Sequence, residues 1–370
     1  GGEGLTTTTT LCWLNDMWKF DVITNEWTWM RGTNLPNQNG IYGTQGVPSP
    51  TNQPGAREFM CTWIDAAGNF WMYGGDGFPA AGGIGNLNDL WRYNPITNEW
   101  TWMKGSNTLI NQSGTYGTIN VSAPSNTPGG RIGPCSWTDN NGKLWMFAGF
   151  GYAASTSGNL NDLWRYDPLT NEWTWKHGTN ISNQYGNYGI QSVASTTNNP
   201  GGREFTASWK DASGDLWLFG GGGYPAIGLQ GHLNDLWKYN ISSNSWTWVK
   251  GTNTVNQLGI YGTQNVSAPG NNPGGRFASA AWVDPLGNFW LFGGSGYASG
   301  TFPGRLNDLW KYNPATNEWS WEHGFNVFNM NGIYGTLQVS APFTTPGSRY
   351  YNTWWKQNNG TFWLFVGLGF

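Results

Sequence analysis

Short runs rich in Trp, Tyr, Phe, Val and Thr alternate with clusters of turn residues along the whole chain. In one representative stretch, four such runs cover residues 57–64, 69–74, 89–93 and 99–104. Residues 65–68 and 94–98 between them indicate short hairpin turns, because Asp and Asn bond the nearby backbone, Pro fixes φ and Gly accepts a positive φ. The pattern predicts a four-stranded antiparallel sheet.

The same arrangement recurs with a fixed period. The tetrapeptide Asn-Asp-Leu/Met-Trp places an Asp every 73 residues, at Asp16, Asp89, Asp162, Asp235 and Asp308. Each period repeats in order, with a few single-residue departures, the segments PGxR, WxDxxGxxW, LNDLWxY, NxWxW and GxYGT. A single sheet of this kind cannot bury both faces, whereas several packed radially can. The sequence therefore predicts one all-β array rather than several unrelated domains.

An apolar stretch, a Gly-Gly doublet, a Tyr and a spaced Trp make each period resemble the kelch repeats of β-propellers, including repeats like those of the galactose oxidase central domain. In one period these are Trp217-Leu218-Phe219-Gly220-Gly221, Tyr224, Asp235-Leu236-Trp237, Tyr239 and Trp246. Two doublets depart from the pattern, at Ala148-Gly149 and Val366-Gly367. The period also exceeds the roughly 50 residues usual for kelch, mainly in the linker after the fourth strand.

The ends of the chain predict how such a propeller closes. The chain begins with third and fourth strands and ends with first and second strands, which are expected to form one shared blade from residues 15–30 and 349–370. Four continuous blades are expected at 57–104, 131–177, 203–250 and 276–323. The prediction is a five-bladed kelch-type β-propeller domain over residues 15–370, with residues 1–14 as an extension.

The composition indicates which classes of function are not expected. Only 11% of residues are charged and the formal net charge is -3, so the basic patch that nucleic acid requires is not expected. No apolar run approaches the roughly 20 residues of a membrane helix, so no membrane insertion is expected. The chain starts at Gly1 without Met, as a processed product would. With its richness in Trp, Asn and Thr, this favours a secreted, extracellular or cell-surface protein.

Five linker tyrosines lie in Gly-x-Tyr-Gly, outside the predicted strands. Each either pins its long loop onto the blade beneath or presents an amphipathic ring with a hydroxyl to a ligand. We favour pinning, and the tyrosines are nevertheless the sequence's preferred ligand candidates. They are Tyr42, Tyr116, Tyr188, Tyr261 and Tyr334.

Two periodic sets of opposite charge are expected on the same face. The first strands open with Arg57, Arg131, Arg203, Arg276 and Arg349, and the third strands with the five Asp residues given above. A ring of arginines could bind an acidic ligand, but equal numbers favour structural Arg–Asp pairs because a buried charge needs a partner. The recurring Trp residues are likewise expected to pack between blades rather than to bind sugars.

An enzymatic site is not expected. The copper enzymes that resemble this fold hold their metal with His and Tyr, and this chain has only three His, of which His177 and His323 share a repeat position with Lys and Arg. Glycosidases need a pair of carboxylates that breaks the repeat symmetry. Only Glu58 and Glu204, which follow first-strand arginines, keep that alternative open. We therefore expect no catalytic residues, no metal and no cofactor.

The N-terminal extension suggests assembly. The five consecutive residues Thr6, Thr7, Thr8, Thr9 and Thr10 have high β-propensity and no place in the propeller, and Cys12 follows them. We expect this segment to pair with a strand edge of its own chain or of a neighbour, for example residues 99–104. Cys12, Cys61 and Cys135 cannot all pair within one chain, so Cys12 could also link two chains.

Two functions follow from these observations. The first is a non-catalytic structural or adhesive building block of the cell surface, with itself or other surface proteins as partners and filaments as one outcome. The second is a multivalent carbohydrate-binding lectin with equivalent pockets on the long-loop face. A glycan-active enzyme is the least favoured.

Overall fold

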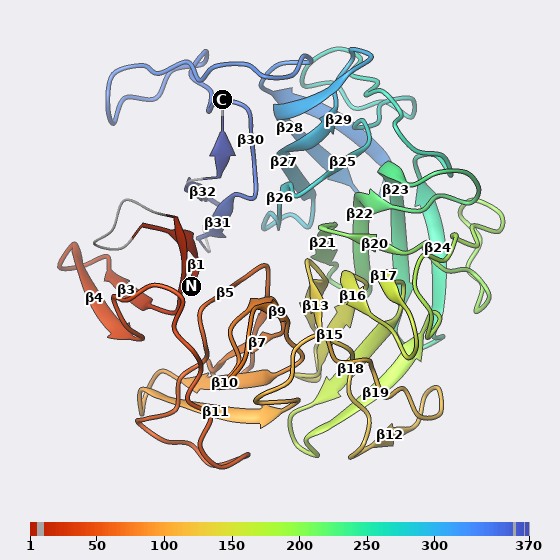
Figure 1. Cartoon of the computed structure of the whole chain (residues 1–370). Coiled ribbons are helices and arrows are strands. Elements are labelled where there is room, and N and C mark those ends of the chain that lie inside the picture. The colour runs from red at the N-terminus through yellow and green to blue at the C-terminus, as the bar shows by residue number, and fades with distance from the viewer. Residues whose placement is uncertain (6–10, 358–359, 366, 370) are drawn as a thin grey trace. The chain divides into compact units, whose positions relative to one another are not determined.

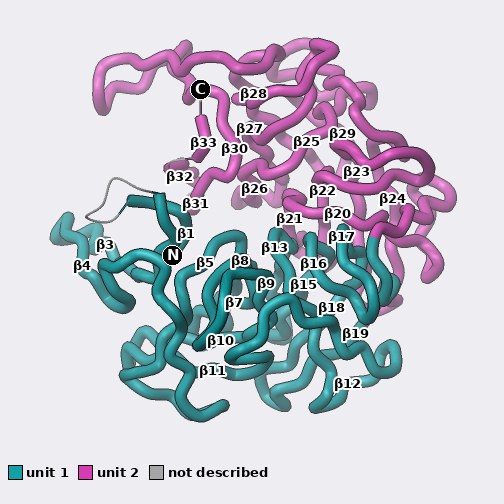
Figure 2. The backbone as a smooth tube through the Cα atoms, viewed as in Figure 1, with its two compact units in different colours: residues 1–182 teal, residues 183–370 magenta. Residues whose placement is uncertain are grey.

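The computed structural model describes residues 1–5, 11–357, 360–365 and 367–369, and this part of the chain consists of strands and turns (Figure 1). It forms two compact units, residues 1–182 and residues 183–370 (Figure 2). No helix of the described residues is long and apolar enough to cross a membrane.

Unit 1 holds the N-terminal strands and two full repeats. The N-terminal strands are β1 (Gly2–Gly4), β2 (Cys12–Leu14), β3 (Met17–Asp21) and β4 (Glu26–Arg31). The next repeat contains β5 (Arg57–Glu58), β6 (Cys61–Ile64), β7 (Phe70–Tyr73), β8 (Asp76–Gly77), β9 (Gly85–Asn86), β10 (Leu90–Asn94) and β11 (Glu99–Lys104). Then follow β12 (Ser122–Ala123), β13 (Arg131–Ile132), β14 (Cys135–Thr138), β15 (Leu144–Phe147), β16 (Phe150–Tyr152), β17 (Ser157–Asn159), β18 (Leu163–Asp167) and β19 (Glu172–His177).

Unit 2 holds two full repeats and the C-terminal strands. The first repeat contains β20 (Arg203–Glu204), β21 (Ala207–Lys210), β22 (Leu216–Gly223), β23 (Gly231–Asn240) and β24 (Ser245–Lys250). The second contains β25 (Arg276–Phe277), β26 (Ala280–Val283), β27 (Phe289–Tyr297), β28 (Pro303–Asn313) and β29 (Glu318–His323). The C-terminal strands are β30 (Arg349–Tyr350), β31 (Thr353–Lys356), β32 (Phe362–Phe365) and β33 (Leu368–Gly369).

Each full repeat forms the expected four-stranded antiparallel sheet. In unit 1 one such sheet has the order β11-β10-β7-β6, with Trp91 opposite Met72 and Trp102. The turn between the third and fourth strands ends in an Asn with positive φ, such as Asn98 at 55°. Asn tolerates this left-handed conformation well, which explains why the same residue recurs in every turn.

The first strand of each repeat differs from the prediction of one continuous run. It breaks after two residues, and the short leading piece pairs with an extension of the second strand beyond the main sheet. In one repeat, β5 pairs with β8 while β6 pairs with β7. The break lies at Phe59, whose φ of 56° turns the chain between the two pieces.

The long linkers cover the outer edges of the sheets. The Ser49 N–H donates to the Trp100 carbonyl and the Gly46 N–H to the Trp102 carbonyl, both on the fourth strand of the following repeat. In the next repeat β12 pairs with β19 in the same way. The expectation that residues 99–104 are a free edge for strand addition was therefore wrong, because the linker already occupies part of it.

Tryptophan packing forms the core of each unit. Trp91 and Trp164 in unit 1 and Trp237 and Trp310 in unit 2 are fully buried. Adjacent sheets are also joined by hydrogen bonds, since Trp63 Nε1 donates to the Trp145 carbonyl at 2.9 Å. Recurring Trp residues therefore join the sheets, as their periodicity predicted.

Candidate functional site

A four-residue buried network recurs in every full repeat. In one of them Arg57 Nη1 and Nη2 donate to the two carboxylate oxygens of Asp89 at 2.6 and 2.7 Å. Tyr42 Oη and Trp91 Nε1 both donate to Asp89 Oδ2, at 2.6 and 2.7 Å. A bidentate Arg with two further donors satisfies a carboxylate that has no access to water.

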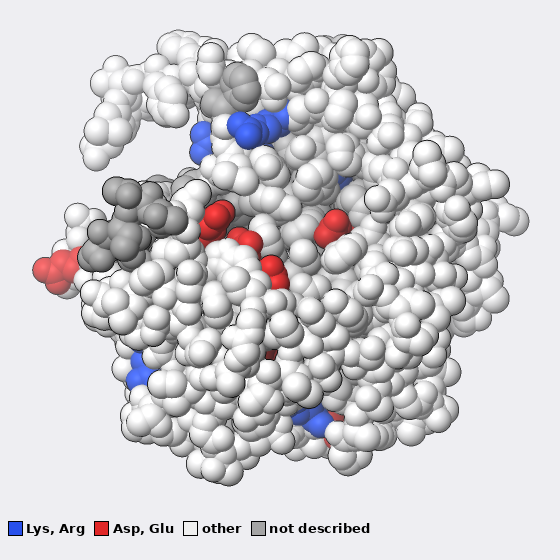
Figure 3. Space-filling model, viewed as in Figure 1, with Lys and Arg blue, Asp and Glu red and all other residues white. Residues whose placement is uncertain are grey.

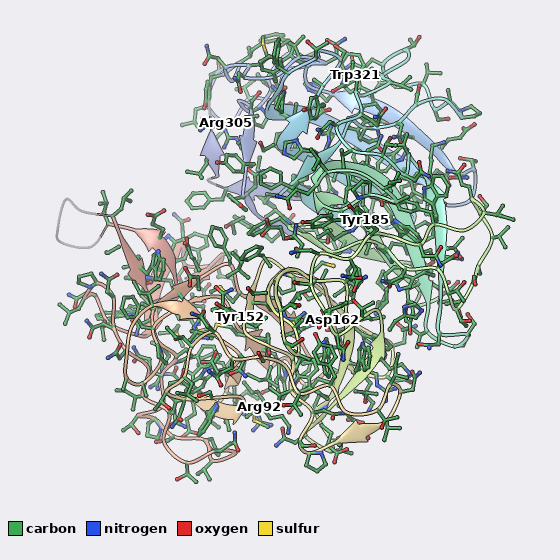
Figure 4. The ribbon with its side chains drawn as sticks, turned by 45° about the vertical axis from the view of Figure 1, so that its right-hand side comes forward. Arg92, Tyr152, Asp162, Tyr185, Arg305 and Trp321 are labelled. Atoms are coloured by element: carbon green, nitrogen blue, oxygen red, sulfur yellow. The ribbon has the colours of Figure 1, made fainter. Side chains whose placement is uncertain are left out.

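The same contacts are built by three other sets of residues (Figure 4 labels Asp162). They are Arg131, Asp162, Tyr116 and Trp164; Arg203, Asp235, Tyr188 and Trp237; and Arg276, Asp308, Tyr261 and Trp310. Each guanidinium is buried and paired with its Asp. These four arginines are therefore committed to the scaffold and do not face an acidic ligand.

This network holds four of the five candidate ligand-binding tyrosines in the interior. Tyr42, Tyr116, Tyr188 and Tyr261 are only 3–6% exposed, and their hydroxyls are committed to the Asp residues. Burial, together with the neighbouring carboxylate, raises the pKa of each phenol well above its ordinary value. Their placement supports the pinning role and leaves no surface for a ligand.

The remaining members of the periodic sets lie near the chain ends. Tyr334 in unit 2 is 84% exposed. Arg349 Nε donates to the Gly347 carbonyl in the same unit. Asp16 in unit 1 accepts a hydrogen bond from Trp18 Nε1 at 2.7 Å, and the Gly1 amino group lies 3.9 Å from its Oδ1.

The N-terminal extension folds back on its own chain. Gly2–Gly4 pair with Cys12–Leu14, and the thiol of Cys12 is buried and donates to the Gly4 carbonyl at 3.4 Å. Burial of this thiol disfavours a disulfide to a second chain. The assembly candidates Thr6 to Thr10 lie outside the described residues.

A second set of backbone contacts links neighbouring repeats where the first strand breaks. The residues at the break are Phe59, Gly133, Phe205, Ala278 and Tyr351, all with φ between 52° and 59°. Within unit 2 the Ala278 N–H donates to the Phe205 carbonyl and the Tyr351 N–H to the Ala278 carbonyl, at 2.9 and 3.1 Å. A bulky residue at positive φ is strained, and these bonds hold it there.

In each full repeat, the residue just before this break is the first of three residues that lie side by side on three paired strands. Paired residues on antiparallel strands share a face, so the three side chains of a row lie next to one another. We call these the end rows. They are Glu58, Asp76 and Asn86; Ile132, Phe150 and Asn159; Glu204, Gly222 and His232; and Phe277, Ser295 and Arg305.

The first end row of unit 1 is acidic. Burial and the charges of Glu3 and Asp76 raise the pKa of Glu58 to about 7, and burial raises that of Asp76. Figure 3 shows carboxylates grouped over β1 and β5 on a face with few other charges. Among the described residues no group of three His, Cys, Asp or Glu side chains is placed to hold a metal ion.

The corresponding region of unit 2 is aromatic. The imidazole of His232 lies 5.2 Å from the Phe277 ring and 5.6 Å from the Tyr297 ring. The centre of the Phe277 ring lies 6.4 Å from that of Phe205 and 6.1 Å from that of Tyr350. Tyr351 packs on Tyr350 and on Phe205, at 4.8 and 4.9 Å. We call these six residues the aromatic platform; each is partly exposed.

Polar groups border the aromatic platform. Arg305 lies over the Tyr350 ring at 5.7 Å, beside the C-terminal strands (Figure 4). Burial raises the pKa of Glu204 to about 7 and lowers that of His232. Partly exposed rings with a few convergent polar groups are typical of a small-molecule site.

Sequence reasoning did not find this site. It noted Glu58 and Glu204 but searched for function in residues that repeat. The sequence signal that marks this site is variation among the repeats. The residue after each first-strand Arg is Glu58, Ile132, Glu204, Phe277 or Tyr350, so it changes at almost every repeat while the Arg before it does not.

Comparisons with known proteins support the fold. No family model matches the sequence, and no curated protein sequence matches it either. Among solved structures, YjhT, a β-propeller, is similar with a TM-score of 0.55 at 14% identity, over 96% of this chain and 85% of that chain. At that identity the likeness shows fold alone. The chain thus has an all-β fold of the propeller type.

Proposed function

We propose that this protein is a non-catalytic, carbohydrate-binding β-propeller that acts as an adhesive module outside the cell. The aromatic platform of unit 2 carries the proposal. Aromatic rings stack on the apolar faces of pyranoses, while nearby polar groups bond the hydroxyls. His232 within the platform, with Glu204 and Arg305 at its border, supplies those polar groups.

The proposed lectin has one principal site rather than five. The repeated tyrosines that would have made equivalent pockets are buried in the Arg–Asp network. The end rows, in contrast, differ in chemistry among the full repeats. Avidity would then come from several copies of the protein on a surface.

A binding role suits the platform better than catalysis. Glycoside hydrolysis uses two carboxyl groups on either side of the scissile bond. Glu204 faces Gly222 across the strands, and the other polar groups named at the platform are a His and an Arg. A glycan array incubated with the whole chain tests the proposal, and hydrolysis of the bound glycans is measured alongside. Absence of binding to any glycan contradicts it, and product release contradicts its non-catalytic part.

We also propose that the propeller has five kelch-type blades, with β3 pairing with β32 to close it. The supporting observation is the exposure of aromatic residues on both half-blades: Trp27 is 64% and Trp363 is 47% exposed, whereas their repeat counterparts Trp100 and Trp71 are 9% and 1% exposed. The register of the full repeats, with Arg92 opposite Trp71, would place Lys19 opposite Trp363.

The exposed half-blades also favour a second function, self-assembly into a building block of a surface layer or filament, if β3 of one copy pairs with β32 of another. Cysteines introduced by Lys19→Cys and Trp363→Cys distinguish the two pairings after oxidation. A cross-linked monomer supports closure within the chain. Cross-linked oligomers support assembly, and a failure to cross-link contradicts both. Light scattering with and without residues 1–12 shows whether the extension contributes.

A further inference from the structure

The glycines of β22 differ in what their backbone requires. Gly220 and Gly221 have φ of 65° and 101°, so a side chain would be strained at either. A Cβ on Gly223 would lie 2.3 Å from the Gly202 carbonyl oxygen. Gly222 has neither restriction, since a Cβ there would meet only the Glu204 side chain, at 4.0 Å. The backbone therefore does not explain the glycine at this position.

Gly222 is the middle member of an end row. Its neighbours on the two paired strands are Glu204 and His232, and all three residues are partly exposed. The equivalent middle positions of other repeats carry Asp76, Phe150 and Ser295. The absence of a side chain thus leaves a gap, open to solvent, between a carboxyl group and an imidazole.

The gap adjoins the aromatic platform. On one side the His232 ring contacts Phe277, and on the other the chain continues from Glu204 into Phe205. His232 Nδ1 is shielded from solvent and has no hydrogen-bond partner among the described residues. Because solvent does not reach Nδ1, a hydroxyl in the gap would bond to the other ring nitrogen, Nε2.

We propose that the gap above Gly222 is the primary subsite for a neutral pyranose, whose ring lies against Phe277 and Phe205 and whose hydroxyls bond to Glu204 and His232. This proposal deepens the proposed function and rests on it. A carboxyl group accepts from two adjacent hydroxyls, and the imidazole donates to or accepts from a third. The space left by the missing side chain accepts the edge of a single sugar ring. A larger side chain at position 222 would fill that space and exclude the sugar.

The test uses the full chain and a panel of methyl glycosides of glucose, galactose, mannose and N-acetylglucosamine, titrated with detection by NMR. At least one glycoside is expected to bind, and Gly222→Leu is expected to weaken that binding at least tenfold. Leu fits this strand position, because Leu368 lies opposite Tyr350 at the equivalent place. Glu204→Gln, which keeps the shape of the side chain, is expected to weaken binding as well.

Gly270→Leu is the matched control. It lies in the same unit, a Cβ there meets nothing within 4 Å, and it is expected to leave binding unchanged. Thermal melting of each variant establishes that it is folded. If a glycoside binds and Gly222→Leu binds it equally well, the subsite is wrong while carbohydrate binding stands. If none of the glycosides and no glycan of the array binds, both proposals fail.

Discussion

Two end rows at the same place in the repeat have opposite characters. In unit 1, Glu58 faces Asp76, so the middle position is filled by a second carboxyl group. In unit 2, Glu204 faces Gly222, and the middle position is empty. Both rows begin one residue after an Arg of the buried network, and both carboxyl groups have a pKa of about 7. The difference teaches that the repeat fixes where the first carboxyl group lies, whereas the residue at the middle position decides whether there is room beside it.

The largest expected effect comes from removing the network on which a row depends. Arg203→Met leaves the Asp235 carboxylate buried without its bidentate partner and is expected to lower the free energy of unfolding by about 3–5 kcal/mol. Urea denaturation measures this loss. Leu229→Met, at a residue that is 87% exposed in the same unit, is the control and is expected to change stability by less than about 0.5 kcal/mol. Equal effects of the two substitutions would show that the network does not hold the rows.

The next effect concerns the tyrosines. Tyr261→Phe removes a buried hydroxyl that donates to Asp308 at 2.6 Å and is expected to cost about 1–3 kcal/mol. Tyr185→Phe, at a residue that is 53% exposed in the same unit, is expected to cost less than about 0.5 kcal/mol. Thermal unfolding of the two variants gives the comparison. A small loss for Tyr261→Phe would reopen a ligand role for the repeated tyrosines.

A smaller effect is expected from pH. Glu204 has a folded pKa of about 7, above its ordinary value, so the folded chain holds a proton there that the unfolded chain has released. This contribution to stability is present at acidic pH and is lost as pH rises towards 7. Glu204→Gln is therefore expected to be more stable than the natural chain at pH 8, by roughly 1 kcal/mol after allowing for partial exposure, and not at pH 4. Melting curves at both pH values check it. A stability difference that does not change with pH would exclude this titration as its cause.

The smallest effect separates the causes of the two raised pKa values. Asp76→Asn removes a charge that contributes to the high pKa of Glu58, which is then expected to fall by a few tenths of a unit to about one unit. The pKa of Glu204, which burial alone raises, is expected to stay near 7 in the same variant. Carbon-13 NMR titration of the two carboxyl groups measures both. A shift of Glu204 in this variant would mean that the two rows are electrostatically coupled.

Much of the fold could be predicted from the sequence because the same strand and turn patterns occur in every repeat. The period locates the strands, and the alternation of Trp with polar residues shows which side chains pack between sheets. The pairing of Arg57 with Asp89 was expected from equal numbers of opposite charges and from the cost of burying one alone. Each of these inferences concerns local pattern or matched repeats.

Only the tertiary structure decided where the candidate site lies. Glu204 lies 18 positions before Gly222, and Gly222 lies 10 positions before His232, so strand register alone makes the three residues neighbours. The φ of 52° at Phe205, set by a backbone bond to the next repeat, brings another ring towards the same place. Periodicity describes what is equal among the repeats, whereas this site consists of side chains that differ. Their proximity depends on the register in which three strands pair, which a linear pattern does not record.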